Sequence, residues 1–209
     1  MRPKNPARPP RPLTRGANDL VSYSGAIFRI ASSGGAHPAR WDEFRSFGPI
    51  SVMRWDPHHP PVRDQPDHAV YYGSPDVTTA VAERFQKYRH VDVHTAAPYL
   101  TGFTNARPLV LLDLTAGWPL TQGASDSLGA APRSTCRNWA REIFDTWPDL
   151  DGLSVRSTMT GRRTFALFSP AMSAMPPRPV FQAPLTDAFI YESLKAAAQQ
   201  INYSIDSLE

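Results

Sequence analysis

Proline is the feature of this sequence that most limits how the chain can fold. There are 22 prolines among 209 residues, and each one fixes φ and removes a backbone hydrogen-bond donor. We therefore expect short helices and strands joined by many loops. Hydrophobic residues still make up 41% of the chain and charged residues 20%, which is typical of a globular protein with a buried core. The length predicts a single domain.

Apolar patterning between the loops predicts more strands than helices. Apolar runs or alternation indicate strands, and a 3.6-residue period indicates helices. The order of elements is mixed, without regular strand–helix alternation, which favours an α+β fold over a doubly wound sheet. The predicted strands cover residues 26–31, 50–54, 69–72, 90–95, 108–115, 151–157 and 163–169, and the predicted helices cover residues 74–88, 134–147 and 187–202.

The sequence lacks the usual signals for a membrane or a secretory route. No apolar run approaches the ~18 residues that cross a bilayer, and the first twenty residues contain no apolar signal region. Cys136 is the only cysteine, so a disulfide framework is excluded. It falls on the apolar face of a predicted helix, where a packed side chain is expected rather than a nucleophile. We expect a cytoplasmic protein with no membrane contact.

The positive charge is concentrated at the start of the chain. The whole chain has 22 Lys and Arg against 19 Asp and Glu, a net charge of +3. Residues 1–19 hold five basic residues and one acidic residue, which leaves 17 basic and 18 acidic residues for the remainder. The basic, proline-rich composition of residues 1–19 predicts a disordered tail whose deletion leaves activity and melting temperature nearly unchanged. Residues 20–209 are expected to form the domain.

The last predicted helix carries an apolar face that must be covered. Ile190, Leu194, Ala197 and Ile201 repeat at helical spacing, so leaving this face in water would be unfavourable. The face either packs on its own domain or docks onto a partner or a second copy of the chain. The sequence leaves both arrangements open.

Familiar catalytic and metal-binding motifs are missing. The sequence has no G-x-x-x-x-G-K-[ST], G-x-G-x-x-G, H-E-x-x-H or G-x-S-x-G motif. His58, His59 and His68 lie in a proline-rich loop, but they lack the spacing and the carboxylate support of a typical metal site. No metal site is therefore predicted.

Two arginines occur where predicted strands should place them in or near the core. Arg29 interrupts the apolar run 26–31, and Arg54 ends the predicted strand 50–54. A buried guanidinium needs a partner. Two arginines on adjacent strands could hold a diphosphate, because their planar donors match phosphate oxygens. Each could equally form a salt bridge with an acidic side chain.

Glu83 has an unexpected place on the predicted helix 74–88. In that helix Ser74 is expected to be the N-cap, and Val77, Val81, Phe85 and Tyr88 are expected to form the buried face. Glu83 points away from this face. It is either a surface acid or a side chain directed into a pocket.

The ordered set Arg29, Arg54, Tyr72, Glu83 and Ser157 resembles the RES domain family. The segments that carry the resemblance are "IFRIA", "MRWD", "AVYYGSPDVTTAVAE", "LDLT", "WPDLDGLSVRST" and "RTFALF", between about residues 26 and 170. The chain departs from the family pattern at Met53, where glycine is usual, and at Asp56, where asparagine is usual. The resemblance implies an ADP-ribosyltransferase-like fold with mixed sheets, flanking helices and a single domain.

The resemblance also implies an activity and roles for individual residues. RES family members are toxins of toxin–antitoxin pairs that degrade NAD⁺ at the nicotinamide–ribose bond, by hydrolysis or phosphorolysis. Glu83, Arg29 and Tyr72 would then be catalytic. Glu83 would bind the ribose hydroxyls and stabilise developing positive charge, Arg29 would hold phosphate and ribose, and Tyr72 would stack on nicotinamide or on the nicotinamide ribose. Arg54, Ser157 and Tyr71 would bind the substrate.

The same resemblance sets expectations for cofactors and partners. No cofactor or metal is needed, because nicotinamide leaves as a neutral molecule; inorganic phosphate is the alternative co-substrate to water. The expected partner is an antitoxin with a Xre-type helix-turn-helix, and a homo-oligomer stays open. Two other functions are kept: transfer of ADP-ribose to a macromolecule, and a non-enzymatic module that binds nucleic acid.

Overall fold

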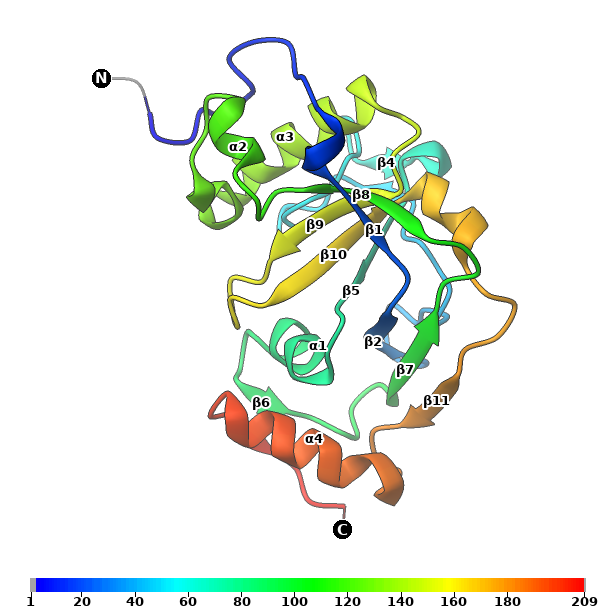
Figure 1. Cartoon of the computed structure of the whole chain (residues 1–209). Helices are drawn as coiled ribbons and strands as arrows, with labels where there is room; N and C mark the ends of the chain where they lie inside the picture. The colour runs from blue at the N-terminus through cyan, green and yellow to red at the C-terminus, as the bar shows by residue number, and fades with distance from the viewer. Residues whose placement is uncertain (1–2, 209) are drawn as a thin grey trace.

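The computed structural model describes residues 3–208 of the chain (Figure 1). None of the helices in this range is long and apolar enough to span a bilayer. The structure combines two main sheets with flanking helices in one domain, so the predicted α+β class with mixed sheets is confirmed.

The larger sheet has five strands in the order β1–β8–β9–β10–β5. Only β8 and β9 run parallel, and the other neighbours are antiparallel. Gly152 begins β9 with φ +145°, and a Cβ there would lie 2.3 Å from the carbonyl oxygen of Ala166. This strand pairing therefore requires glycine. The strands are β1 (Leu20–Tyr23), β5 (Val70–Gly73), β8 (Leu109–Asp113), β9 (Gly152–Arg156) and β10 (Arg163–Phe168).

The second sheet is antiparallel, with β7 between two partners in the order β11–β7–β2. Two short pairs complete the strands: β12 lies parallel to β6, and β3 lies antiparallel to β4. These strands are β2 (Ala26–Ser32), β3 (Phe47–Gly48), β4 (Arg63–Asp64), β6 (His90–Val91), β7 (Pro98–Thr104), β11 (Phe181–Pro184) and β12 (Ser204–Ile205).

The two main sheets meet at one backbone bridge. The amide of Phe28 donates to the carbonyl of Ser74 at 2.7 Å, and the amide of Ser74 donates back to Phe28 at 3.0 Å. Phe28 lies on β2, and Ser74 directly follows β5. The bridge therefore holds the start of helix α1 beside the middle of β2.

The helices cover different parts of the two sheets (Figure 1). Helices α2 and α3 pack on one face of the five-stranded sheet, while α1 and α4 pack together beside the smaller sheet. The helical segments are α1 (Val77–Arg84), α2 (Trp118–Thr121), α3 (Arg133–Thr146) and α4 (Ala188–Gln200), with 3-10 turns η1 (Ala17–Asp19), η2 (Pro66–His68), η3 (Asp126–Ala130) and η4 (Ser169–Ala174).

Helix α4 buries its apolar face within its own chain. Ile190, Leu194 and Ala197 are at most 6% exposed and share a core cluster with Val81 of α1 and Leu100 of β7. Of the two arrangements left open by the sequence, the structure shows self-packing.

Three sequence expectations about local structure are wrong. Residues 50–54 form no strand, because Ile50 donates to the side chain of Asp56, and Arg137 donates to the carbonyls of Ser51 and Met53. These side chains replace the hydrogen bonds of a neighbouring strand. The predicted strand 90–95 stops at Val91, because an acid just beyond it, Asp92, accepts from the amides of His94 and Thr95.

The third correction concerns helix α1. Asp76, rather than Ser74, is its N-cap and accepts from the amide of Thr79 at 2.8 Å. Tyr88 lies beyond the helix and is 75% exposed, so the predicted apolar stripe ends earlier. Thr79 and Ala80 are buried alongside Val81.

The described part of the basic tail lies against helices α2 and α3. The indole N–H of Trp118 donates to the carbonyl of Thr14, and that of Trp139 donates to the carbonyl of Pro6, both at 2.9 Å. Both tryptophans are at most 1% exposed. Asn5 adds hydrogen bonds to the η3 region. This arrangement differs from the expected disordered tail, while the boundary at residue 19 stays a prediction.

These contacts predict that deletion of residues 1–16 destabilises the protein. The deletion removes both indole acceptors, and each lost hydrogen bond is worth about 1 kcal/mol. The free energy of unfolding should therefore fall by about 2 kcal/mol or more, measured by urea titration. The control replaces Lys4 and Arg8, both exposed, with alanine and should leave stability unchanged. If the deletion behaves like this control, the contacts of the tail contribute nothing.

Candidate functional site

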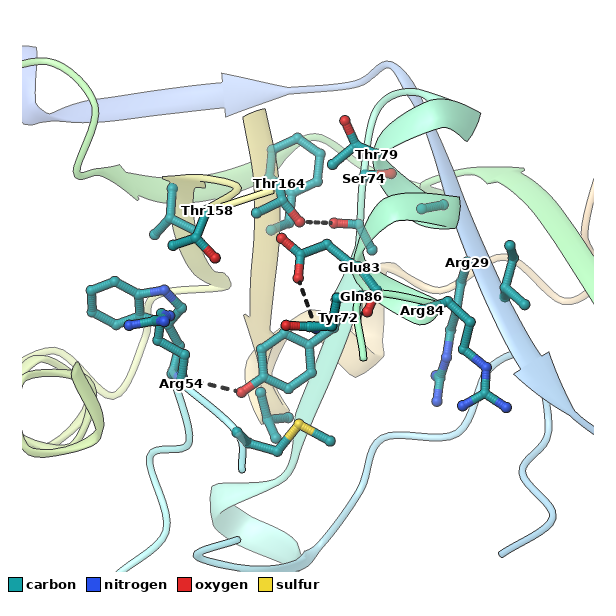
Figure 2. Close-up of a pocket in the computed structure, with 18 of the residues that line it drawn as sticks. Arg29, Arg54, Tyr72, Ser74, Thr79, Glu83, Arg84, Gln86, Thr158 and Thr164 are labelled. Atoms are coloured by element: carbon teal, nitrogen blue, oxygen red, sulfur yellow. Dashed lines mark hydrogen bonds between the residues drawn. The ribbon is translucent and has the colours of Figure 1, made fainter. Parts of the chain in front are cut away.

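A large pocket opens between α1, β2, β5 and the loop that carries Arg54 (Figure 2). Its volume is about 790 Å³, within the size range of pockets that hold cofactor-sized ligands. The bridge between Phe28 and Ser74 lies at its wall. Four of the six residues predicted for the site line this pocket: Arg29, Arg54, Tyr72 and Glu83.

Glu83 points into the pocket from α1 and is held by neutral donors. The hydroxyl of Ser157 donates to Glu83 Oε1 at 2.6 Å, and Gln86 Nε2 approaches Oε2 at 3.4 Å. The Ser157 hydroxyl in turn accepts from the amides of Met159 and Thr160. Oε1 is therefore fixed, while Oε2 is the oxygen available to a ligand.

Ser157 is 3% exposed and is not part of the pocket surface. Sequence reasoning joined it to Glu83 only through the resemblance. The structure joins them by a hydrogen bond, which suits a residue that positions Glu83. A direct contact between Ser157 and a substrate stays a prediction.

The hydroxyl of Tyr72 forms hydrogen bonds inside the protein. The hydroxyl donates to Asp56 Oδ1 at 2.9 Å and accepts from the amide of Trp55 at 3.3 Å. Burial, followed by the negative charge of Asp56, raises the pKa of Tyr72 well above its usual value. The hydroxyl is therefore no proton donor for a ligand, and the ring is the part of Tyr72 that a ligand can contact.

Asp56 is fully buried and receives several donors. Arg45 forms an ion pair with it, and the amide of Ile50 donates to Oδ2 at 2.9 Å. Because a buried carboxylate needs such partners, this group ties the loop to β5. Neither Asp56 nor Arg45 was recognised from the sequence as part of the site, although Asp56 stands where the family pattern has asparagine.

Arg29 reaches the pocket from β2, and none of the carboxylates in residues 3–208 lies within ion-pair distance of it. One guanidinium nitrogen donates to the carbonyl of Glu43 at 2.8 Å, and the group lies 4.3 Å from the centre of the Tyr71 ring. Tyr71 is 1% exposed and belongs to the core, and burial raises its pKa to about 12. Tyr71 therefore contacts the guanidinium of Arg29 with its ring and does not itself line the pocket. A substrate contact by Tyr71 stays a prediction.

Arg54 lies at the other end of the pocket from Arg29 (Figure 2). It donates to the carbonyl of Ala131 at 2.5 Å and approaches the sulfur of Cys136 at 3.6 Å. Cys136 is fully buried, and burial raises the pKa of its thiol, so the expected packed cysteine is confirmed. The two arginines do not come from adjacent strands, and they form no joint clamp.

Arg84 takes the place beside Arg29 that Arg54 was expected to fill. Its guanidinium points the same way as that of Arg29 (Figure 2) and donates to the hydroxyl of Ser32 at 2.7 Å. Desolvation, followed by the positive charge of Arg29, lowers the pKa of Arg84. Sequence reasoning missed Arg84. This residue directly follows Glu83, so its side chain projects from the helix about 100° around the axis from that of Glu83.

The pocket is strongly positive although the domain is nearly neutral. Among the described residues, seven basic side chains and one acid, Glu83, line it. Only one of the seven, Arg45, has a carboxylate within ion-pair distance. Such a wall favours an anionic ligand. The basic residues are Arg29, Arg45, Arg54, Arg84, Lys87, Arg133 and Arg156.

This arrangement can bind a phosphorylated ligand and act on a centre that becomes positive. Paired guanidinium groups at one end suit phosphate oxygens. A fixed carboxylate in the middle can stabilise a cationic transition state. The partly buried ring of Tyr72 lines the pocket and can stack on a planar ring.

The comparisons with known proteins agree with this fold. A chain of the crystal structure of the M. tuberculosis MbcT–MbcA toxin–antitoxin complex superimposes with a TM-score of 0.55 and 18% sequence identity. The match covers 85% of this chain and 92% of that chain, and at this identity it shows a shared fold. No curated protein matches the sequence.

The family model of the RES domain matches residues 26–188. This range includes the pocket-lining residues on β2, β5, α1 and β9, and it extends past the segment that suggested the family. The chain therefore belongs to the RES domain family.

Proposed function

We propose that this protein cleaves the nicotinamide–ribose bond of NAD⁺ and acts as the toxin of a toxin–antitoxin pair. The observation that carries the proposal is the carboxylate of Glu83 in a pocket whose other charged side chains, among the described residues, are all basic. NAD⁺ has both matching features: a diphosphate, and a glycosidic bond whose cleavage creates a cationic sugar.

The arginine pair at one end of the pocket would hold the diphosphate. Arg29 and Arg84 have no carboxylate partner among the described residues, and their guanidinium groups lie close together. Their charges are therefore available to phosphate oxygens. Arg54 at the other end would contact the nicotinamide side of the substrate.

Glu83 would act on the reacting centre. Loss of nicotinamide leaves an oxocarbenium-like ribose, and a fixed carboxylate lowers the energy of that state. Ser157 holds Oε1, so Oε2 would accept a ribose hydroxyl. The ring of Tyr72 would stack on nicotinamide while its hydroxyl stays bound to Asp56.

The proposed biological role follows from the family and from the superimposed structure. That structure is a toxin–antitoxin complex, and we infer a cognate antitoxin for this chain as well. A cell that makes an NAD⁺-degrading enzyme needs such a partner to limit its activity. We propose water or inorganic phosphate as the acceptor of ADP-ribose.

Incubation of the purified chain with NAD⁺, with and without inorganic phosphate, tests the function. Nicotinamide should accumulate as NAD⁺ disappears, and both are measured by chromatography. Free ADP-ribose as the second product indicates water as acceptor, and phosphorylated ADP-ribose indicates phosphate. ADP-ribose attached to a macromolecule would show transfer instead. Absence of NAD⁺ turnover would overturn the proposal.

Glu83→Ala should lower the rate of NAD⁺ loss by about 100-fold or more, the usual effect of removing a group that stabilises transition-state charge. The matched control is Glu192→Ala, at an exposed glutamate of α4, which should keep the full rate. A folded Glu83→Ala protein with wild-type turnover would remove Glu83 from the mechanism.

Arg29→Lys should lower the rate by more than tenfold, about 1.4 kcal/mol in the barrier. Lysine keeps the charge but loses the planar fork and the stacking on Tyr71. The rate constant and KM are measured together, with Arg40→Lys on an exposed side chain as the control. Unchanged kinetics in Arg29→Lys would mean that Arg29 serves only the structure.

Tyr72→Phe separates the ring from the hydroxyl. The variant removes one donor from the fully buried Asp56, so the free energy of unfolding should fall by about 1–3 kcal/mol. The ring remains, so NAD⁺ turnover well below the melting temperature should stay within a few-fold of wild type. Tyr88→Phe, at an exposed tyrosine, is the stability control. Loss of activity in a folded Tyr72→Phe protein would assign the hydroxyl a chemical role.

A further inference from the structure

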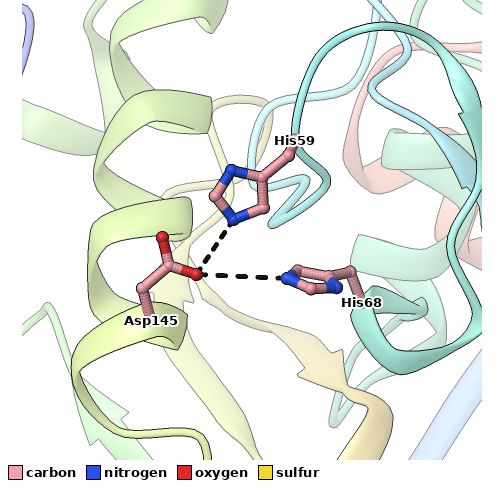
Figure 3. A group of neighbouring side chains, drawn as sticks. All are labelled: His59, His68 and Asp145. Atoms are coloured by element: carbon pink, nitrogen blue, oxygen red, sulfur yellow. Dashed lines mark hydrogen bonds and ion pairs between the residues drawn. The ribbon is translucent and has the colours of Figure 1, made fainter.

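A second cluster of polar side chains lies outside the pocket, between the loop 57–68 and helix α3. His59 and His68 each direct one ring nitrogen toward the same carboxylate oxygen of Asp145 (Figure 3). These three atoms lie within 4.8 Å of one another. Sequence reasoning considered His58, His59 and His68 together and found no carboxylate to support them.

In the folded chain, His58 is separated from His59 and His68, and a carboxylate joins the two remaining histidines. His58 turns inward and is fully buried, with its Nδ1 3.9 Å from Asp56. His59 and His68 turn outward, and α3 supplies the missing carboxylate, Asp145. The result is a set of two imidazoles and one carboxylate, which is a common ligand set for divalent transition metals.

A hydrogen bond accounts for only one of the distances among these three ligand atoms. His59 Nε2 lies 3.0 Å from Asp145 Oδ1, which one hydrogen bond explains. His68 Nε2 lies 4.0 Å from the same oxygen, too far for a hydrogen bond. Ligand atoms around a tetrahedral Zn²⁺ lie about 3.4 Å apart, given metal–ligand distances of about 2.1 Å. Small side-chain rotations would bring all three atoms to that spacing.

The loop is held in place before any ion binds. Gln65 is 7% exposed, and its side chain accepts from the amide of His59 at 2.9 Å and donates to the His59 carbonyl at 2.8 Å. The Gln65 carbonyl accepts from the amide of His68 at 3.0 Å. One buried residue therefore positions the backbone of both histidines.

Helix α3 contributes a second anchor and a ring contact. Arg141, one turn before Asp145, donates to the carbonyl of His58. The ring of Phe144 packs 4.8 Å from that of His68.

We propose that His59, His68 and Asp145 form a binding site for a divalent transition-metal ion of the Zn²⁺ type. The bound ion would connect the loop to α3, with its remaining coordination positions taken by water. The loop follows directly after Asp56, so the ion would also stabilise the wall of the pocket that carries Arg54. The site does not depend on the proposed reaction.

The test is a Zn²⁺ titration of the full chain without an affinity tag, in competition with a chromophoric chelator. One equivalent should bind saturably. His59→Ala and Asp145→Asn should each weaken binding at least tenfold. The matched controls, His37→Ala and Asp126→Asn, change an exposed histidine and an exposed carboxylate outside the loop and α3 and should bind as wild type does.

Melting temperature with and without Zn²⁺ provides the second measurement. Zn²⁺ should raise the melting temperature of the wild type and of both controls, but not of the two site variants. Asp145→Asn keeps the shape of the side chain, so its metal-free melting temperature should stay close to wild type. Absence of saturable binding, or equal binding by the site variants and the controls, would overturn the proposal.

Discussion

The site depends most on the hydrogen bonds and the ion pair of one buried carboxylate, that of Asp56. It is fully removed from water and is stabilised by Arg45, the amide of Ile50 and the hydroxyl of Tyr72. Removing a charge from water is costly unless such partners are in place. The irregular segment before it is also held by Arg137, which donates to the carbonyls of Ser51 and Met53. Asp56 adds the connection between this segment and Tyr72 on β5.

The site is shared between two sheets that meet at the bridge between Phe28 and Ser74. Arg29 comes from the smaller sheet, Tyr72 from the larger one, and Glu83 from the helix that begins just after the bridge. Their relative positions are therefore set by two hydrogen bonds together with the packing of α1 on α4 and β2. Arg29 and Glu83 have opposite charges and are held by separate elements, so the space between them is open to a ligand.

The sequence predicted those parts of the fold that depend on local patterning. The apolar runs at 26–31 and 108–115 and the helices around residues 134–147 and 187–202 are present with small changes of boundary. The strand at 50–54 is absent, because Arg137 and Asp56 supply its hydrogen bonds, and Arg137 is more than 80 residues away. Within the site, Glu83 was singled out because it departs from the apolar pattern. Arg84 and Asp145 carry no local signal, since their meaning depends on distant residues.

The docked tail affects the order in which the chain can complete its fold. Residues 6 and 14 are synthesised before their partners Trp139 and Trp118, which follow 133 and 104 residues later in the chain. Contacts across such separations form late, because the intervening chain must first be ordered. The tail is thus made before its partners but fixed in place only after them. Until that step, the indole N–H groups of Trp118 and Trp139 lack the two carbonyl acceptors that the tail provides.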